Sequence, residues 1–294
     1  MSEQLPVVPR RSALYLPASN ARAIEKARDL PTDVVILDLE DAVAVECKDL
    51  ARKQCCDAVL SGGYGHRELV IRVNGKGTPW HEADLAAALR AAPHGILLPK
   101  VNSPQDVLDV AQAMDELATP EHTRIWCMLE TPRGVLAAPQ ILASHQRLAV
   151  AVMGTSDLTQ GLHAQHTRLR LPLITALGLC LLAARTNELA ILDGVSLELD
   201  DPEGFREGCE QSKQLGFDGK TLIHPKQLAP CNQAFSPSDD ELAHAREVIE
   251  AHGRARRLGS GVSVVGGRLV EDLHVREALR VIALRDALMP RGQA

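Results

Sequence analysis

The stretch VVILDLEDAV, residues 34–43, decides the fold. It starts with a nearly continuous apolar run over residues 34–39, as expected of a parallel strand that is covered on both faces. Asp38, Glu40 and Asp41 stand where this strand would give way to a loop. Because an unpaired carboxylate is costly to bury, acids at this point indicate that the strand ends at a functional site and not in a packed interior.

Short apolar runs of this kind recur along the chain, and helical patterns separate most of them. The expected strands are residues 12–16, 34–39, 69–73, 95–98, 125–129, 148–153, 190–195 and 219–223. The expected helices between them are residues 20–30, 46–60, 80–91, 104–118, 134–144, 175–187 and 202–215. Eight strands alternating with helices predict an α/β fold of the closed (β/α)8 TIM-barrel type. An open dinucleotide-binding sheet would need a GxGxxG turn after the first strand, and the sequence LPASN at residues 16–20 is not one.

The last part of the chain has a different pattern. Residues 237–257 and 271–289 look helical, and a Gly/Val-rich turn region at residues 259–267 separates them. We therefore expect a TIM-barrel catalytic domain over residues 1–235 and a C-terminal helical extension over residues 236–294. The extension is either a small cap on the barrel or an arm that reaches a neighbouring subunit.

Composition narrows the class of protein. A net charge of -6 and an aromatic content of 2% argue against a nucleic-acid partner. The longest apolar stretch, residues 171–184, is too short to span a bilayer, and the N-terminal MSEQLPVVPRR lacks the apolar core of a signal peptide. Seven scattered cysteines without a CxxC pair are typical of reduced thiols. We expect a soluble cytoplasmic protein with no membrane partner.

Two further strings place carboxylates after apolar runs, MLETPRG at residues 128–134 and GTSDL at residues 154–158. In a barrel, the active site lies at the carboxyl ends of the strands. Glu130 and Asp157 are oxygen donors at the ends of adjacent expected strands, which suits Mg²⁺. Neither string contains histidine, which disfavours zinc. The alternative is a pair of surface carboxylates.

Arg72 ends the third expected strand. Its guanidinium can grip a substrate carboxylate or stabilise an oxyanion as it forms. The alternative is a structural salt bridge to Asp38, Glu40 and Asp41, and the two roles are compatible. The acidic cluster itself would then fix Arg72 or hold metal-bound waters, unless its role is purely structural.

Tyr15 ends the first expected strand, and Arg22 and Lys26 follow it four residues apart. This spacing puts both cations on one helical face. They can pin the phosphates of a large anionic cofactor, or they form a solvated helix face.

Seven motifs in unbroken order carry a family resemblance: YLPASNARAIEKA, VVILDLEDAV, VIRVNG, LLPKVNS, MLETPRG, GTSDL and GKTLIHPKQL. From about Tyr15 to His224 the chain resembles the citrate lyase β-subunit-like CoA-ester lyases of the HpcH/HpaI aldolase superfamily. The tail GGRLVEDLHVREA is also similar to that family's C-terminal segment. The resemblance implies a Mg²⁺-dependent TIM barrel, a homotrimer or hexamer, that cleaves a β-hydroxyacyl-CoA such as citramalyl-CoA or malyl-CoA. The products would be acetyl-CoA and a 2-oxo acid.

The resemblance also assigns roles to individual residues. It places the Mg²⁺ ligands on Glu130 and Asp157 and the substrate-gripping arginine on Arg72, with Glu130 also next to the substrate. It places the contacts to the CoA moiety on Tyr15, Arg22, Lys26, Ile223 and His224. In the retro-Claisen cleavage implied here, Arg72 stabilises the enolate, and Asp38, Glu40 and Asp41 form a supporting shell.

One position departs from the family pattern. The family often carries an aspartate in its tail, which acts on the acetyl carbon in a neighbouring subunit's site. The matching residue here is Glu271, followed by Asp272. We expect Glu271 to protonate the acetyl carbanion, with Asp272 as the alternative.

Three other functions remain open. The first is the β subunit of an acyl-carrier-protein-dependent citrate lyase, which acts on a citryl thioester. The second is a class II 2-oxo acid aldolase, although that chemistry generally uses a histidine base where this chain has the acidic cluster. The third is a non-enzymatic relative that binds CoA or acts as an assembly partner. Candidate thioesters differ by as little as a methyl group, worth only ~1–3 kcal/mol in an apolar pocket, and no single residue selects among them.

Overall fold

The computed structural model describes residues 7–289. Residues 1–6 of the N-terminal stretch and residues 290–294 of the predicted extension lie outside the described range. The chain forms two compact units. One unit is Arg10–Phe235, and the described part of the other comprises residues 7–9 and 236–289.

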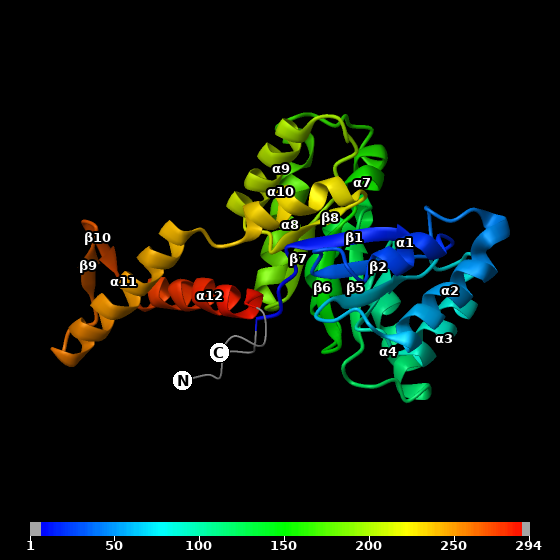
Figure 1. Ribbon diagram of the computed structural model, residues 1–294, viewed down its shortest axis with the longest axis horizontal. Helices are drawn as coiled ribbons and strands as arrows, with labels where there is room; N and C mark the ends of the chain where they lie inside the picture. The colour runs from blue at the N-terminus through cyan, green and yellow to red at the C-terminus, as the bar shows by residue number, and fades with distance from the viewer. Residues whose placement is uncertain (1–6, 290–294) are drawn as a thin grey trace. The chain divides into compact units, whose positions relative to one another are not determined.

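The larger unit is a closed barrel of eight parallel strands (Figure 1). Each strand pairs with the next one along the chain, and β8 pairs with β1. The strands are β1 (Ser12–Pro17), β2 (Val34–Asp38), β3 (Glu68–Arg72), β4 (Gly95–Leu98), β5 (Arg124–Leu129), β6 (Leu148–Met153), β7 (Ala190–Asp193) and β8 (Gly219–Leu222). The predicted (β/α)8 barrel with C-terminal helices is therefore confirmed.

Helices follow the strands around the barrel. They are α1 (Ala21–Lys26), α2 (Lys48–Ser61), α3 (His81–Ala91), α4 (Pro104–Glu116), α5 (Pro132–Leu136), α6 (Ala138–Leu142), α7 (Thr155–Gly161), α8 (Leu171–Thr186), α9 (Pro202–Leu215) and α10 (Leu228–Phe235). Two short 3₁₀ turns, Val45–Cys47 and Pro225–Gln227, precede α2 and α10. The helix expected at residues 134–144 is divided into α5 and α6, and α8 begins four residues before its expected start because Pro172 fits in a first helical turn. The sequence did not predict α7 or α10.

The alternation of side chains along each strand explains both the apolar runs and the charged residues at the strand ends. Ile36, Val70 and Trp126 fill the inside of the barrel, while the residues next to them in sequence pack against the helices. Because both faces are buried, the strands have no polar side. The inward-facing positions continue to Asp38 and Arg72, which end β2 and β3 and are direct neighbours in the register. Alternation thus carries these two charged side chains to the barrel's carboxyl end.

The second unit contains α11 (Asp239–Arg257), α12 (Asp272–Leu288) and a hairpin of β9 (Ser263–Val265) and β10 (Arg268–Val270). A small apolar core holds α11, α12 and the hairpin together. Gly266 and Gly267 form the two-residue turn, and both have positive φ, at 55° and 77°. Such hairpin turns need residues that tolerate positive φ, which explains the glycine pair within the predicted turn region.

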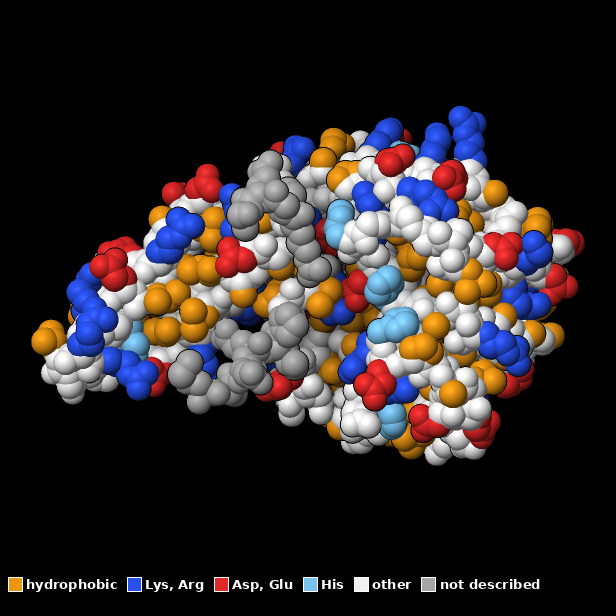
Figure 2. All heavy atoms as spheres, turned by 60° about the horizontal axis from the view of Figure 1, so that its bottom comes forward, with side chains coloured by type: hydrophobic (Ala, Val, Ile, Leu, Met, Phe, Trp, Pro, Cys, Tyr) orange, Lys and Arg blue, Asp and Glu red, His pale blue; other side chains and the backbone are white. Residues whose placement is uncertain are grey.

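Among the helices within residues 7–289, none combines the length and the apolar character needed to cross a membrane. On the face of the molecule shown in Figure 2, acidic and basic side chains are interspersed.

Candidate active site

A cavity of about 310 Å³ lies at the carboxyl ends of the barrel strands. Seven of the residues singled out in the sequence line it: Tyr15, Asp38, Asp41, Arg72, Glu130, Asp157 and Ile223. Met128, Gly154 and Thr221 are also part of its wall. Residues far apart in the sequence thus converge on one small space.

Arg72 is held in place mainly by Asp38. Its Nε and Nη2 each donate to one oxygen of Asp38 at 2.6 Å, a bidentate pair. The third nitrogen, Nη1, lies 3.0 Å from Glu40 Oε2 and 4.0 Å from Asp41 Oδ2. The salt bridge to the acidic cluster is therefore present. Nη1 is the guanidinium nitrogen that Asp38 does not engage, and it also lies 3.8 Å from Met128 Sδ in the cavity wall.

The LDLED turn that carries these acids is itself tightly bonded. Asp38 accepts hydrogen bonds from the backbone N–H groups of Glu40 and Ala42. The buried Lys48 ammonium donates to the carbonyls of Leu39 and Glu40 at 2.6 and 2.7 Å. Burial raises the pKa of Glu40, while Arg72 and Lys100 oppose that shift. The turn is a rigid support in which each buried charge has a partner.

Glu130 follows β5 and is only 1% exposed. Its Oε1 accepts a hydrogen bond of 2.6 Å from the backbone N–H of Lys100. Its Oε2 is buried and has no hydrogen-bond partner among residues 7–289. Burial, reinforced by the nearby charge of Glu40, raises the pKa of Glu130 to about 8. A carboxylate in this setting lacks a positive partner, and a bound cation would supply one.

Gly154, which follows β6 and is the N-cap of α7, leaves room for Glu130. A Cβ atom at Gly154 would overlap the carboxylate and the Cβ of Glu130. Asp157 follows in the first turn of α7, half-buried on the wall of the same cavity. Within the described part of the chain, no three His, Cys, Asp or Glu side chains form a ligand cluster. Glu130 and Asp157 would offer a cation two carboxylates, a donor set that suits Mg²⁺ because it keeps several waters or substrate oxygens.

The residues assigned to CoA are distributed differently. Tyr15 lies inside the cavity, with its ring 4.8 Å from the Arg72 guanidinium, and Ile223 is 38% exposed at the cavity wall. His224 lies next to it and caps the turn before α10. Arg22 and Lys26 are exposed on α1. They do not line the cavity.

In the second unit, Glu271 and Asp272 have different surroundings. Glu271 is the N-cap of α12, and its backbone N–H donates to His274 Nδ1. Asp272 accepts from Nε2 of the buried His252 at 2.9 Å. Asp272 is therefore engaged in holding α12 against α11, while the carboxylate of Glu271 belongs to the turn between β10 and α12.

Sequence reasoning missed several supporting residues. Lys100 contacts both Glu130 and Glu40, and only its place at a strand end signalled this. A second cluster lies at β7 and β8, where the fully buried Asp193 pairs with Lys220 at 2.9 Å and with Arg170 at 2.5 Å. Asp193 ends a strand, as the other acids do, but its side chain faces the helix layer and not the cavity.

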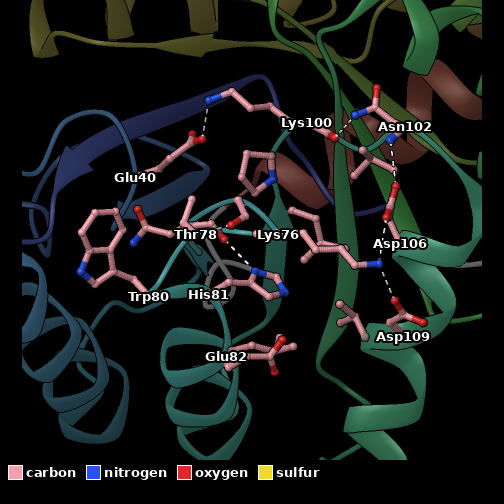
Figure 3. A pocket seen from close by; sticks show the side chains of 18 of the residues that line it. Glu40, Lys76, Thr78, Trp80, His81, Glu82, Lys100, Asn102, Asp106 and Asp109 are labelled. Carbon is pink, nitrogen blue, oxygen red and sulfur yellow. Dashed lines mark hydrogen bonds and ion pairs between the residues drawn. The ribbon is translucent and has the colours of Figure 1, made fainter.

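A second, larger pocket of about 1160 Å³ lies beside the first, between the ends of β2, β3 and β4 (Figure 3). Its wall includes Lys76, Trp80 and His81, together with the Lys100–Glu40 pair. Asp41 lines both pockets. The Lys100–Glu40 pair lines the larger pocket, and neither residue lines the smaller cavity.

Residues 11–225 match the family model described as HpcH/HpaI aldolase/citrate lyase. The chain belongs to this family. The match covers the barrel from β1 to the turn after β8. It includes the strand ends that carry the cavity residues, so the predicted family is confirmed.

Similar proteins span nearly the whole chain. A protein of Cereibacter sphaeroides named (3S)-malyl-CoA thioesterase is 46% identical over 280 residues, covering 95% of this chain and 96% of the relative. The citrate lyase subunit beta of Escherichia coli is 32% identical over 279 residues, covering 93% and 92%. A crystal structure of the protein CitE from Mycobacterium tuberculosis, in complex with magnesium, acetoacetate and coenzyme A, superposes with a TM-score of 0.78 at 29% identity. It covers 96% of this chain and 99% of that one.

Proposed function

We propose that this protein is a Mg²⁺-dependent lyase that cleaves a β-hydroxyacyl-CoA into acetyl-CoA and a 2-oxo acid. The observation that carries the proposal is the buried, unpartnered oxygen of Glu130 in a cavity that also presents Arg72 and Asp157. Family membership supports the same conclusion, because this family contains lyases that cleave carbon–carbon bonds. The related CitE protein was crystallised with magnesium and coenzyme A.

In this proposal Glu130 and Asp157 hold the metal ion. Bound Mg²⁺ would orient the substrate's carboxylate and hydroxyl and lower the pKa of that hydroxyl. Arg72 Nη1 donates to the thioester oxygen, where negative charge develops as the carbon–carbon bond breaks. The substrate hydroxyl loses its proton to solvent water as its oxygen becomes the carbonyl of the 2-oxo acid. The electron pair of the broken carbon–carbon bond moves onto the thioester as an enolate, and an acid then protonates the acetyl carbon. Asp38 and Glu40 hold the Arg72 guanidinium in the orientation that this step needs.

The small cavity has room for the acyl part of a thioester, and the CoA part would extend away from it. We propose that Tyr15 and Ile223 flank the thioester end. Arg22 and Lys26, both exposed, would meet the CoA phosphates. His224, beside Ile223, would contact the CoA moiety at the barrel rim.

We further propose that Glu271 is the acid that protonates the acetyl carbon, since Asp272 is engaged with His252. In the family pattern this acid acts in a neighbouring subunit's site, which requires a homo-oligomer, a trimer or a hexamer. All seven cysteines are free thiols, which supports a cytoplasmic location.

Thioester hydrolysis is the second candidate function, and one observation favours it. The relatives named (3S)-malyl-CoA thioesterase share 44–46% identity with this chain, against 32–33% for the citrate lyase beta subunits. Glu271 also differs from the aspartate of the family pattern, and a displacement of about 1 Å in a catalytic group can cost about 10²-fold in rate. In hydrolysis water attacks the thioester carbonyl, and no acetyl carbanion has to be protonated.

Product analysis separates the two functions. Purified protein with Mg²⁺ and (3S)-malyl-CoA should release acetyl-CoA and glyoxylate if it is a lyase, or malate and free CoA thiol if it is a hydrolase. EDTA should abolish either activity, and Mg²⁺ should restore it. A Glu130→Gln variant that keeps full turnover would overturn the metal assignment. Citramalyl, methylmalyl and citryl thioesters, offered on CoA and on an acyl carrier protein, then define the acid and the carrier.

A further inference from the structure

Lys100 has an unusual backbone for a lysine. It follows β4 with φ at +52°, in the left-handed region that side chains other than glycine rarely adopt. This conformation directs its N–H to Glu130 Oε1 at 2.6 Å. Backbone strain of this kind persists only where the surrounding structure enforces it, and it is often found at functional sites.

The side chain of Lys100 reaches a second acid of the site. Its Nζ donates to Glu40 Oε1 at 2.9 Å, and Figure 3 shows this bond spanning from the β4 end to the β2 end. The other oxygen of Glu40 contacts Arg72 Nη1 at 3.0 Å. Lys100 therefore contacts both Glu130, a proposed metal ligand, and Glu40, the acid that contacts Arg72 Nη1.

Charge explains why this site needs a lysine. Five carboxylates lie in or beside the cavity, from Asp38, Glu40, Asp41, Glu130 and Asp157, and the cations near them are Arg72, Lys100 and the buried Lys48. Burial works against the ammonium, yet the hydrogen bond to Glu40 and the surrounding acids raise the pKa of Lys100. A substrate that carries its own carboxylate would meet strong repulsion without this cation.

We propose that Lys100 is a positioning residue for the reaction. Its ammonium neutralises Glu40 and keeps that side chain on Arg72, so that Glu40 does not turn toward the metal ion or the substrate. Its backbone N–H fixes Glu130. This inference rests on the proposed function, because it assigns Lys100 a part in the same site.

Three variants and one control test the proposal. Lys100→Met removes the ammonium at similar length, Lys100→Arg keeps the charge, and Lys100→Gly removes the ammonium while it relieves the strained φ. Lys76→Ala is the matched control, because Lys76 lines the neighbouring pocket and its ion pairs within residues 7–289 are with Asp106 and Asp109. The measurements are kcat and KM with the active thioester, Mn²⁺ affinity by titration calorimetry without substrate, and Tm.

We expect Lys100→Met and Lys100→Gly to lower kcat/KM by about 10-fold or more, the loss expected of one charge-assisted hydrogen bond. Both variants should bind Mn²⁺ at least as tightly as the wild type, since a nearby positive charge is gone and the N–H to Glu130 remains. Lys100→Arg should recover most of the activity, Lys100→Gly should melt higher than Lys100→Met, and Lys76→Ala should match the wild type.

Wild-type kcat/KM in Lys100→Met would overturn the proposal. So would parallel losses of activity and Mn²⁺ affinity, because these would indicate a collapsed site. A wild-type protein that neither cleaves nor hydrolyses any of the thioesters would instead refute the proposed function, which keeps the two failures distinct.

Discussion

The substitution Gly154→Ala is expected to weaken metal binding although it replaces neither of the two proposed metal ligands. Gly154 has φ at -95°, so alanine fits its backbone. The new methyl group, however, would overlap both the carboxylate and the Cβ of Glu130. Because Glu130 is only 1% exposed, its side chain cannot swing out to solvent and must shift within a packed site.

The size of the effect follows from the overlap. Overpacking a close-packed site costs about 1–3 kcal/mol. In the metal-free variant, Glu130 shifts to relieve part of this strain. When Glu130 moves back to the position in which it binds the metal, the overpacking strain returns. At roughly 1.4 kcal/mol per tenfold change in affinity, Mg²⁺ affinity should therefore fall about 5- to 100-fold.

Titration calorimetry with Mg²⁺ and thermal unfolding without metal measure the two effects. Gly178→Ala is the matched control, because Gly178 lies inside α8 with no atom within 4 Å of its added Cβ. That variant should bind Mg²⁺ like the wild type and melt at the same or a higher temperature, since alanine is favoured over glycine in a helix by up to about 1 kcal/mol. Wild-type Mg²⁺ affinity in Gly154→Ala would refute the placement of Glu130 at the metal.

Three more predictions follow from the buried charges. Arg72→Lys should lower turnover by about 10²-fold or more, because one point charge replaces the bidentate fork on Asp38 and the donor toward the substrate; steady-state kinetics will measure this. Mg²⁺ affinity should rise about tenfold per pH unit up to about pH 8, because Glu130 must lose its proton when the metal binds, and affinity that is flat from pH 6 to 8 would contradict this. Although burial opposes it, the charges of Lys220 and Arg170 lower the pKa of Asp193 to about 2. This carboxylate should therefore add about 2 kcal/mol to the free energy of unfolding above pH 4, and that contribution should be lost as the pH falls through 2. Urea unfolding of Asp193→Asn should show a deficit of about 3–5 kcal/mol at pH 7, and the deficit should shrink below pH 4.

The barrel could be predicted because its strands have a simple physical signature. A run such as residues 34–39 is apolar on both faces, which only a parallel strand between a barrel interior and a helix layer requires. The helices were harder to place where proline or a short turn sets the boundary. The division of residues 134–144 into α5 and α6 is one case, and α7 is another because its seven residues are too few for a periodic pattern.

The sequence predicts contacts within the site only where they follow from the alternation of side chains along a strand. Asp38 and Arg72 end neighbouring strands on the same face, so their pairing follows from the register. The contact of Lys100 with Glu130 depends on a left-handed backbone. The space that Gly154 leaves for Glu130 depends on how two loops pack. Such contacts join residues about 25 to 30 positions apart, and no local pattern in the sequence records them.

The barrel cavity alone does not separate carbon–carbon cleavage from thioester hydrolysis. Both reactions place a thioester carbonyl beside Arg72 and develop negative charge on its oxygen, so the same guanidinium serves each of them. They differ in what must reach the acetyl carbon, because cleavage needs a proton there and hydrolysis does not. Among the acids that line the cavity, Asp38 holds Arg72, Glu130 and Asp157 are the proposed metal ligands, and Asp41 lies 4.0 Å from Arg72 Nη1 and from Lys100 Nζ. In the proposed mechanism that proton comes from Glu271, outside the barrel, so the choice between the two activities would depend on whether the Glu271 carboxylate reaches the acetyl carbon.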